Sequence, residues 1–290
     1  MAAAGLFLAA GLLAQTPAPT PPPPQVNLPQ PSPTATLKQR VGLTDIEIVY
    51  SRPGVKGRKI FGGLEPWGEV WRAGANSSTK ITFSTPVRIG GKEIAAGTYG
   101  LFAQLGPDEW TIILNQDAKQ WGAYTYDAKN DVVRVPAKVQ RLAEPVETFT
   151  IDINDIRDDS ASLVLAWENT RVAVRFETDA VNAVVAQIDA ALAAGAKIPV
   201  NRLAQAAIFF GDHGIRLTQA LEWMDAAIAQ TPKSYYLFYH KAVIQAKAGD
   251  KAGATDSARK AIELAAADKE NPVAQAEYKR LNETLIASLK

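Results

Sequence analysis

The chain has 290 residues, 47% of them hydrophobic, which is enough for one large domain or two moderate domains with their own cores. Its formal net charge is +1, so no field of the whole protein attracts nucleic acid or a membrane surface. The absence of cysteine excludes disulfides, thiolate nucleophiles and cysteine metal sites, and His213 and His240 are the only imidazoles. We therefore expect no resident metal or cofactor.

The N-terminal region has the pattern of an exported protein. An apolar run from Leu6 to Leu13, followed by small and polar residues, is typical of a signal peptide over residues 1–14 and is too short to span a bilayer. Residues 15–36 are rich in proline, which favours an extended, semi-rigid linker, and recognition of that proline run by a partner is the alternative. The sequence predicts a periplasmic or secreted protein without a transmembrane segment.

Residues 37–177 have the alternation of strands with one buried face. Gly90-Gly91 and Gly106-Pro107-Asp108 are turn signals between such runs, and Glu168-Asn169-Thr170 is predicted to be the turn of a tight hairpin. About eight to ten short strands without intervening helices predict an antiparallel β-sandwich or barrel. The clearest alternating runs are 46–50, 81–83, 98–103, 110–114, 131–135 and 148–153.

Several short motifs follow one another in this region. They are Tyr50-Ser-Arg-Pro, Lys56-Gly-Arg58, Ile60-Phe-Gly-Gly, Pro66-Trp-Gly-Glu-Val-Trp-Arg72, Gly74-Ala-Asn76, Ala96-Gly-Thr-Tyr99, Glu109-Trp110, Asn115, Trp121-Gly122 and Tyr124. Over about residues 31–176 this region resembles the bacterial family called domain of unknown function 2911, with Gly100 where a serine commonly follows the tyrosine. The resemblance implies a β-rich domain of exported bacterial proteins, often followed by helical repeats, and brings no established activity.

Residues 50–76 are the strongest candidate for a ligand site, because six glycines, two prolines and five basic residues suit neither a helix nor a regular strand. Arginine forks and free backbone N–H groups suit carboxylate, phosphate or sulfate groups. The alternative is that Arg52 and Arg72 pair with Glu65 and Glu69 and only pin the loop down. The predicted ligand-binding residues are Arg52, Lys56, Arg58, Glu69, Trp71, Arg72, Asn76, Trp121 and Tyr124.

Aromatic residues form a second candidate feature, because an exposed ring on a β-sandwich can stack on a sugar. Trp121 has a loop context in which its ring either faces a ligand or covers the end of the sheet as a lid. Trp71 and Trp110 have strand-like contexts, in which burial in the core is the alternative to binding.

The sequence holds no standard catalytic motif of the nucleophile-elbow, zinc-protease or calcium-loop kind. The leading interpretation is therefore an exported binding or interaction protein with an anionic or carbohydrate ligand. The rival is an enzyme that acts on a carbohydrate or another polar cell-envelope substrate, with Glu69 and either Asp108 or Asp117 as the carboxylate pair.

From residue 178 the hydrophobic period changes to about 3.6, which predicts helices. The first ends at Gly195, and others are expected at 200–211, 216–230, 233–248, 251–267 and 272–288. Ala220 and Ala227 recur 34 residues later as Ala254 and Ala261, which resembles degenerate tetratricopeptide repeats. The fold class is thus α+β multidomain, with helices 178–290 that either bind a protein partner in a groove or support the sandwich.

Overall fold

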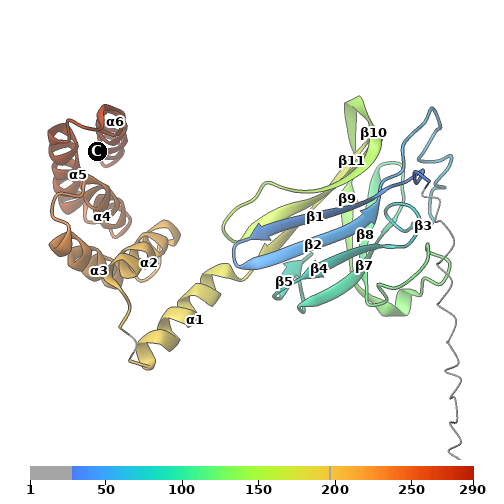
Figure 1. Cartoon of the computed structure of the whole chain (residues 1–290), viewed down its shortest axis with the longest axis horizontal. Coiled ribbons are helices and arrows are strands. Elements are labelled where there is room, and N and C mark those ends of the chain that lie inside the picture. Colours follow the sequence, from blue (N-terminus) through green and yellow to red (C-terminus); the bar gives the residue numbers. More distant parts are fainter. Residues whose placement is uncertain (1–27, 196) are drawn as a thin grey trace, which may run out of the picture.

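The computed structural model describes residues 28–195 and 197–290, and Figure 1 shows a β-sandwich followed by six helices. The signal peptide and most of the proline-rich linker that the sequence predicts lie outside the described residues. The larger sheet contains β1 (Thr34–Val41), β2 (Thr44–Ser51), β3 (Val70–Trp71), β4 (Thr79–Phe83), β7 (Gly97–Gln104), β8 (Glu109–Asn115) and β9 (Asp131–Lys138). The smaller sheet contains β5 (Val87–Ile89), β6 (Lys92–Ile94), β10 (Gln140–Asn154) and β11 (Ser160–Thr178).

Both sheets are antiparallel, which confirms the predicted architecture as a sandwich. The larger sheet has the order β1-β2-β4-β7-β8-β9, with β3 paired to β7, and the smaller has the order β10-β11-β5-β6. β1 begins at Thr34, within the residues that the sequence assigned to the linker, because Thr34 pairs with Ser51 and starts an alternating run. The two-residue turn Gly90-Gly91 joins β5 to β6, and both glycines have positive φ angles.

The core lies between the two sheets, where the inward residues of each strand meet. Alternation in β2 buries Ile46, Ile48 and Tyr50, as the period of two requires. One end of the sandwich is closed by aromatic rings in edge-to-face and stacked contacts, including Phe61–Trp110 at 4.7 Å and Trp71–Trp167 at 5.8 Å between centroids. Trp71 is only 3% exposed. It belongs to this core and cannot offer its ring to a ligand.

The hairpin predicted at Glu168 is wrong, because β11 continues through it as one strand from Ser160 to Thr178. Glu168 has φ 52°, and the register with β10 shifts on both sides of its partner Val146. Such a bulge bends a strand without reversing it. The polar residues 168–170, which have the sequence pattern of a turn, therefore belong to a bulge within one long strand, β11.

The six helices have the positions that the hydrophobic period predicted. Their bounds are α1 (Ala180–Ala193), α2 (Val200–His213), α3 (Leu217–Gln230), α4 (Tyr235–Lys247), α5 (Lys251–Ala267) and α6 (Pro272–Ser288). Asn271 caps α6 through its side chain, which accepts a hydrogen bond from the N–H of Ala274, with Pro272 in the first turn. Ala220 on α3 and Ala254 on α5 are fully buried where helices touch. Their assignment to tetratricopeptide repeats stays a prediction.

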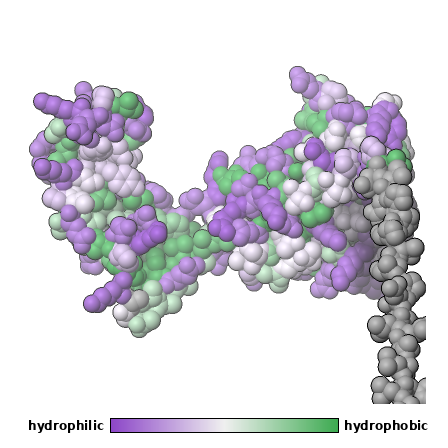
Figure 2. Space-filling model, viewed as in Figure 1, coloured by the Kyte–Doolittle hydropathy of each residue, from purple (hydrophilic) through white to green (hydrophobic). Residues whose placement is uncertain are grey.

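The helices have a core of their own, centred on Phe210 and Met224, that shares no residue with the core of the sandwich. α1 follows β11 directly and leads to α2–α6, which lie beyond the sandwich in Figure 1. Figure 2 shows hydrophobic residues gathered along α1 and the adjoining part of α2. Leu192 on α1, for example, keeps 41% of its surface exposed.

Candidate functional site

The basic residues at the start of the predicted ligand loop are held by backbone carbonyl groups. Arg52 donates from Nε to the carbonyl of Phe149 and from Nη2 to Oγ1 of Thr150, both at 2.9 Å. Arg58 donates to the carbonyls of Val55 and Gly54 in its own turn, at 3.1 and 2.6 Å. The bonds of Arg52 fix the loop against β10. Among the residues that the structure describes, neither guanidinium group forms an ion pair with a carboxylate.

The predicted alternative, in which arginines of this loop pair with Glu65 and Glu69, is not what the structure contains. Within residues 28–195 and 197–290, no ion pair shorter than 4.0 Å includes Arg52 or Arg72. Lys56 instead donates from Nζ to the carbonyl of Pro31 at 3.3 Å. The loop is therefore held by hydrogen bonds to the main chain and by aromatic packing.

The carboxyl group of Glu65 has a pKa that its surroundings shift. Partial burial raises the pKa of its side chain to about 7, against the opposing effects of Arg72, Arg58 and the Trp71 indole. The indole N–H of Trp71 donates to the carbonyl of Gly74 at 3.2 Å. Glu65 thus changes charge near neutral pH, which the sequence alone gave no reason to expect.

Two loops lie side by side next to β4, and main-chain hydrogen bonds join them. The N–H of Gly122 donates to the carbonyl of Asn76, and the N–H of Ser78 donates to the carbonyl of Gln120, each at 3.0 Å. Ser77 and Trp121 form the β-bridge between them. This pairing brings together two of the predicted ligand residues, Asn76 and Trp121, which are 45 positions apart in the chain.

A glycine is required at position 122, where the two loops lie against each other. Its φ is 71°, and a Cβ atom there would lie 2.8 Å from the ring of Tyr124 and 3.1 Å from Nη1 of Arg72. Arg72 and Tyr124 therefore meet at Gly122, and Tyr124 keeps 81% of its surface exposed. Both residues lie beside the groove described next but do not line it.

A groove of about 420 Å³ opens beside Trp121 on the outer face of the larger sheet. Trp121 is 65% exposed, so its ring is available to a ligand, while its backbone is fixed by the bridge to Ser77. The side chain of Asn76 donates to Oγ of Ser51 at 3.2 Å and stands at the same wall. The lining consists of Gln30, Pro31, Thr34, Val49, Tyr50, Ser51, Asn76, Ser77, Ser78, Lys80 and Trp121.

A second hollow of about 340 Å³ adjoins the first at Lys80. Its lining consists of Lys80, Thr98, Gln116, Asp117, Ala118 and Lys119. We call the two hollows together the Trp121 groove. Asp117 is its one carboxylate, and Oδ1 of Asp117 accepts a hydrogen bond from the N–H of Lys119 at 3.0 Å.

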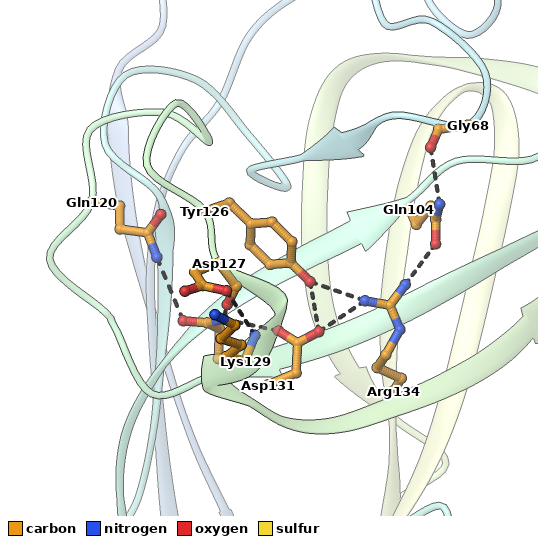
Figure 3. Close-up of polar contacts among 9 residues, drawn as sticks. Gly68, Gln104, Gln120, Tyr126, Asp127, Lys129, Asp131 and Arg134 are labelled. Atoms are coloured by element: carbon orange, nitrogen blue, oxygen red, sulfur yellow. Dashed lines mark hydrogen bonds and ion pairs between the residues drawn. The ribbon is translucent and has the colours of Figure 1, made fainter.

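The loop that carries Trp121 is anchored by a polar network around Asp131, shown in Figure 3. The Asp131 carboxylate, with a side chain only 7% exposed, accepts from the Tyr126 hydroxyl at 2.6 Å, from Arg134 at 2.8 Å and from Asn115 at 2.8 Å. Arg134 also donates to Gln104 at 2.6 Å. Burial and Asp131 raise the pKa of Tyr126 to about 12, so its hydroxyl keeps its proton at neutral pH and keeps donating.

This network is a structural anchor, because each carboxylate oxygen of Asp131 has donors and the tyrosine cannot ionise near neutrality. Asn115, fully buried at the end of β8, extends the network by donating to the carbonyl of Asp127 at 3.0 Å. The network holds both ends of the segment between β8 and β9. The position of Trp121 is thereby set by a fixed loop.

The carboxylates proposed as a catalytic pair do not face one another across the Trp121 groove. Only Asp117 lines it, whereas Glu69 and Asp108 are exposed outside its lining. In the part of the chain that the structure describes, no three metal-ligating side chains converge, and no helix has the length and apolar character to cross a membrane.

Lys80 and the serines at 77 and 78 are groove residues that the sequence analysis missed. A lysine in the middle of a strand and two serines in a loop are ordinary surface residues in a sequence, so no local signal marks them. Only the order of strands places them beside Asn76 and Trp121.

The fold and the groove define a class: an antiparallel sandwich that carries an open, polar groove with an aromatic rim on its larger sheet, followed by helices. The family described as "Protein of unknown function (DUF2911)" matches residues 32–176, and the chain belongs to this family. The match confirms the resemblance given by the sequence motifs. Neither the curated proteins nor the solved structures contain a match to the chain.

Proposed function

We propose that the protein binds an oligosaccharide in the Trp121 groove without catalysing a reaction on it. The observation that carries the proposal is the exposed indole of Trp121, held on a fixed backbone at the rim of a groove lined by hydroxyl and amide groups. Sugars combine apolar ring faces with many hydroxyl groups, and such a groove offers partners for both.

Hydrogen-bonding groups for a sugar are available in the groove. The hydroxyl groups of Thr34 and Ser77 line it, and neither takes part in the side-chain hydrogen bonds found in the described ranges. Asn76 is fixed by its bonds to Ser51 and to the carbonyl of Ser32, which orients its amide at the wall. Preorganised polar groups of this kind provide orientation and specificity.

Binding without catalysis is favoured by the lining of the groove. Glycoside hydrolysis of the common kind uses two carboxyl groups on opposite sides of the scissile bond, and Asp117 is the single carboxylate here. We also propose that the protein acts outside the cytoplasm, as residues 1–14 predict, where cell-envelope glycans are accessible.

Calorimetric titration of the full chain with a panel of oligosaccharides tests the proposal. Trp121→Ala should weaken binding at least tenfold, about 1.4 kcal/mol, because the stacking surface is lost. Tyr124→Ala is the matched control, since Tyr124 is exposed on the same loop and does not line the groove. Equal effects of the two substitutions, or no binding of any oligosaccharide by the unaltered chain, would overturn the proposal.

A further inference from the structure

We infer that the ligand of the Trp121 groove is an acidic oligosaccharide of more than one ring, which crosses the sheet and places a carboxylate on Lys80. This inference rests on the proposed function and specifies the class of sugar. Three features of the groove carry it: its length, its charge and the way its far wall is built.

The length of the groove follows from the strands that it crosses. Its lining runs from Thr34 on β1 through Ser51 on β2 and Lys80 on β4 to Thr98 on β7, and these strands are neighbours in that order. Three strand spacings of about 4.8 Å give a length of about 14 Å. A single pyranose ring cannot fill both hollows, whereas a short chain of rings lying across the strands can.

The register of the strands shows that the groove crosses the sheet obliquely, because Thr34 is the partner of Ser51 whereas Thr98 is the partner of Thr82 and not of Lys80. Val49 of β2 is the partner of Lys80, and Lys80 is the partner of Gly100 on β7. Side chains of directly paired residues point to the same face of a sheet. Lys80 therefore stands midway along the groove, where its two hollows meet.

The charge of the groove favours an acidic ligand. Lys80 is the only charged residue that lines the hollow beside Trp121, and Lys119 is added in the second hollow, where Asp117 is the one opposing charge. Within residues 28–195 and 197–290, the hydrogen bonds and ion pairs of lysine ammonium groups do not include Lys80. A carboxylate on the ligand would supply the charged acceptor that this ammonium group lacks.

The far wall of the groove is built on a glycine. A Cβ atom at Gly100 would lie 2.8 Å from the carbonyl oxygen of Asp117 and 2.7 Å from the ring of Phe102. The absence of a side chain lets the loop 116–119 lie directly on the sheet at Gly100, and these residues form one side of the second hollow. The second hollow therefore exists because this loop packs on the sheet. The Asp131 network holds the loop in that position.

Chains of uronic acids and peptide-free chains of amino sugars with a lactyl ether are two kinds of glycan that carry such a carboxylate. Calorimetry of the full chain with tetragalacturonate and with a peptidoglycan glycan tetramer distinguishes them. The same tetramers with their carboxyl groups reduced to alcohols are the neutral probes. We expect one acidic tetramer to bind at least tenfold more tightly than its reduced form and than the corresponding dimer.

Lys80→Met should abolish the preference for the acidic tetramer, while Lys80→Arg should retain most of it because the positive charge remains. Lys38→Met is the matched control, since Lys38 lies on the same face of the sheet but is paired with Glu47 at 2.7 Å. Equal affinity for acidic and reduced tetramers, with both weakened by Trp121→Ala, would overturn this inference and leave the proposed function standing. Equal affinity for dimer and tetramer would overturn the inferred length, and failure of every probe would overturn both proposals.

Discussion

Glu65 links the protonation of the predicted ligand loop to the stability of the fold. Its side chain has the ordinary pKa of 4.5 in an unfolded chain, but partial burial raises the pKa to about 7 in the folded protein. Between these pH values the unfolded chain holds fewer protons than the folded chain, so stability decreases as pH increases. The stabilising contribution is fully present below pH 4.5 and is lost as pH rises through about 7.

The size of the effect follows from the rise in pKa from 4.5 to about 7. At 1.36 kcal/mol per pKa unit this rise corresponds to about 3 kcal/mol. We expect about 2 kcal/mol, because part of the side chain stays in contact with water and solvent screens its charge. Glu65→Gln, which is neutral at every pH, should therefore match the unaltered chain near pH 4.5 and be about 2 kcal/mol more stable at pH 8.

Urea denaturation at pH 4.5 and at pH 8 measures this difference. Glu69→Gln is the matched control, because it removes the same charge from an exposed position in the same loop. If Glu65→Gln and Glu69→Gln change stability equally at both pH values, Glu65 is not a buried carboxyl group and the description of this loop is incorrect.

Further predictions concern the anchor, the domains and the N-terminus. Asp131→Ala should destabilise the fold by about 3 kcal/mol, because Tyr126 and Arg134 lose their shared acceptor, and a urea-measured loss below about 1 kcal/mol would contradict the network. The fragment 28–178 should fold alone with the circular dichroism of a β-protein, since the cores are separate, and an unfolded fragment would show that they are not. Mass spectrometry of the protein from its native host should find a chain that begins near Gln15, and an intact Met1 in the cytosol would refute export.

The elements that the sequence predicted are those whose signal is local. Alternation in residues 46–50 and a period of 3.6 after residue 178 each report which face of one element is buried, so strands and helices were located without knowledge of their neighbours. The hairpin at Glu168 failed because a polar interruption has the same local pattern in a turn and in a bulge. Only the partner strand β10 distinguishes the two.

The candidate site was predictable in part, for the same reason. Asn76 and Trp121 were recognised from loop composition, but Lys80 acquires its place in the groove from the strand order β2-β4-β7, which no local pattern encodes. In the sequence Glu65 likewise resembles an exposed acid. Its partial burial depends on the aromatic residues that pack at this end of the sandwich. The predicted roles of Arg52, Lys56, Arg58, Glu69, Arg72 and Tyr124 in ligand binding stay predictions.

The position of the ligand can be measured directly through the indole N–H signals of the six tryptophans in a nitrogen-labelled sample. On titration with the oligosaccharide that binds most tightly, the signal of Trp121 should move in proportion to occupancy, because its ring lies at the groove. The signals of Trp71, Trp110 and Trp167 should stay in place, because these rings are buried in the core. Saturable binding that leaves the Trp121 signal unmoved would contradict the assignment of the groove as the binding site.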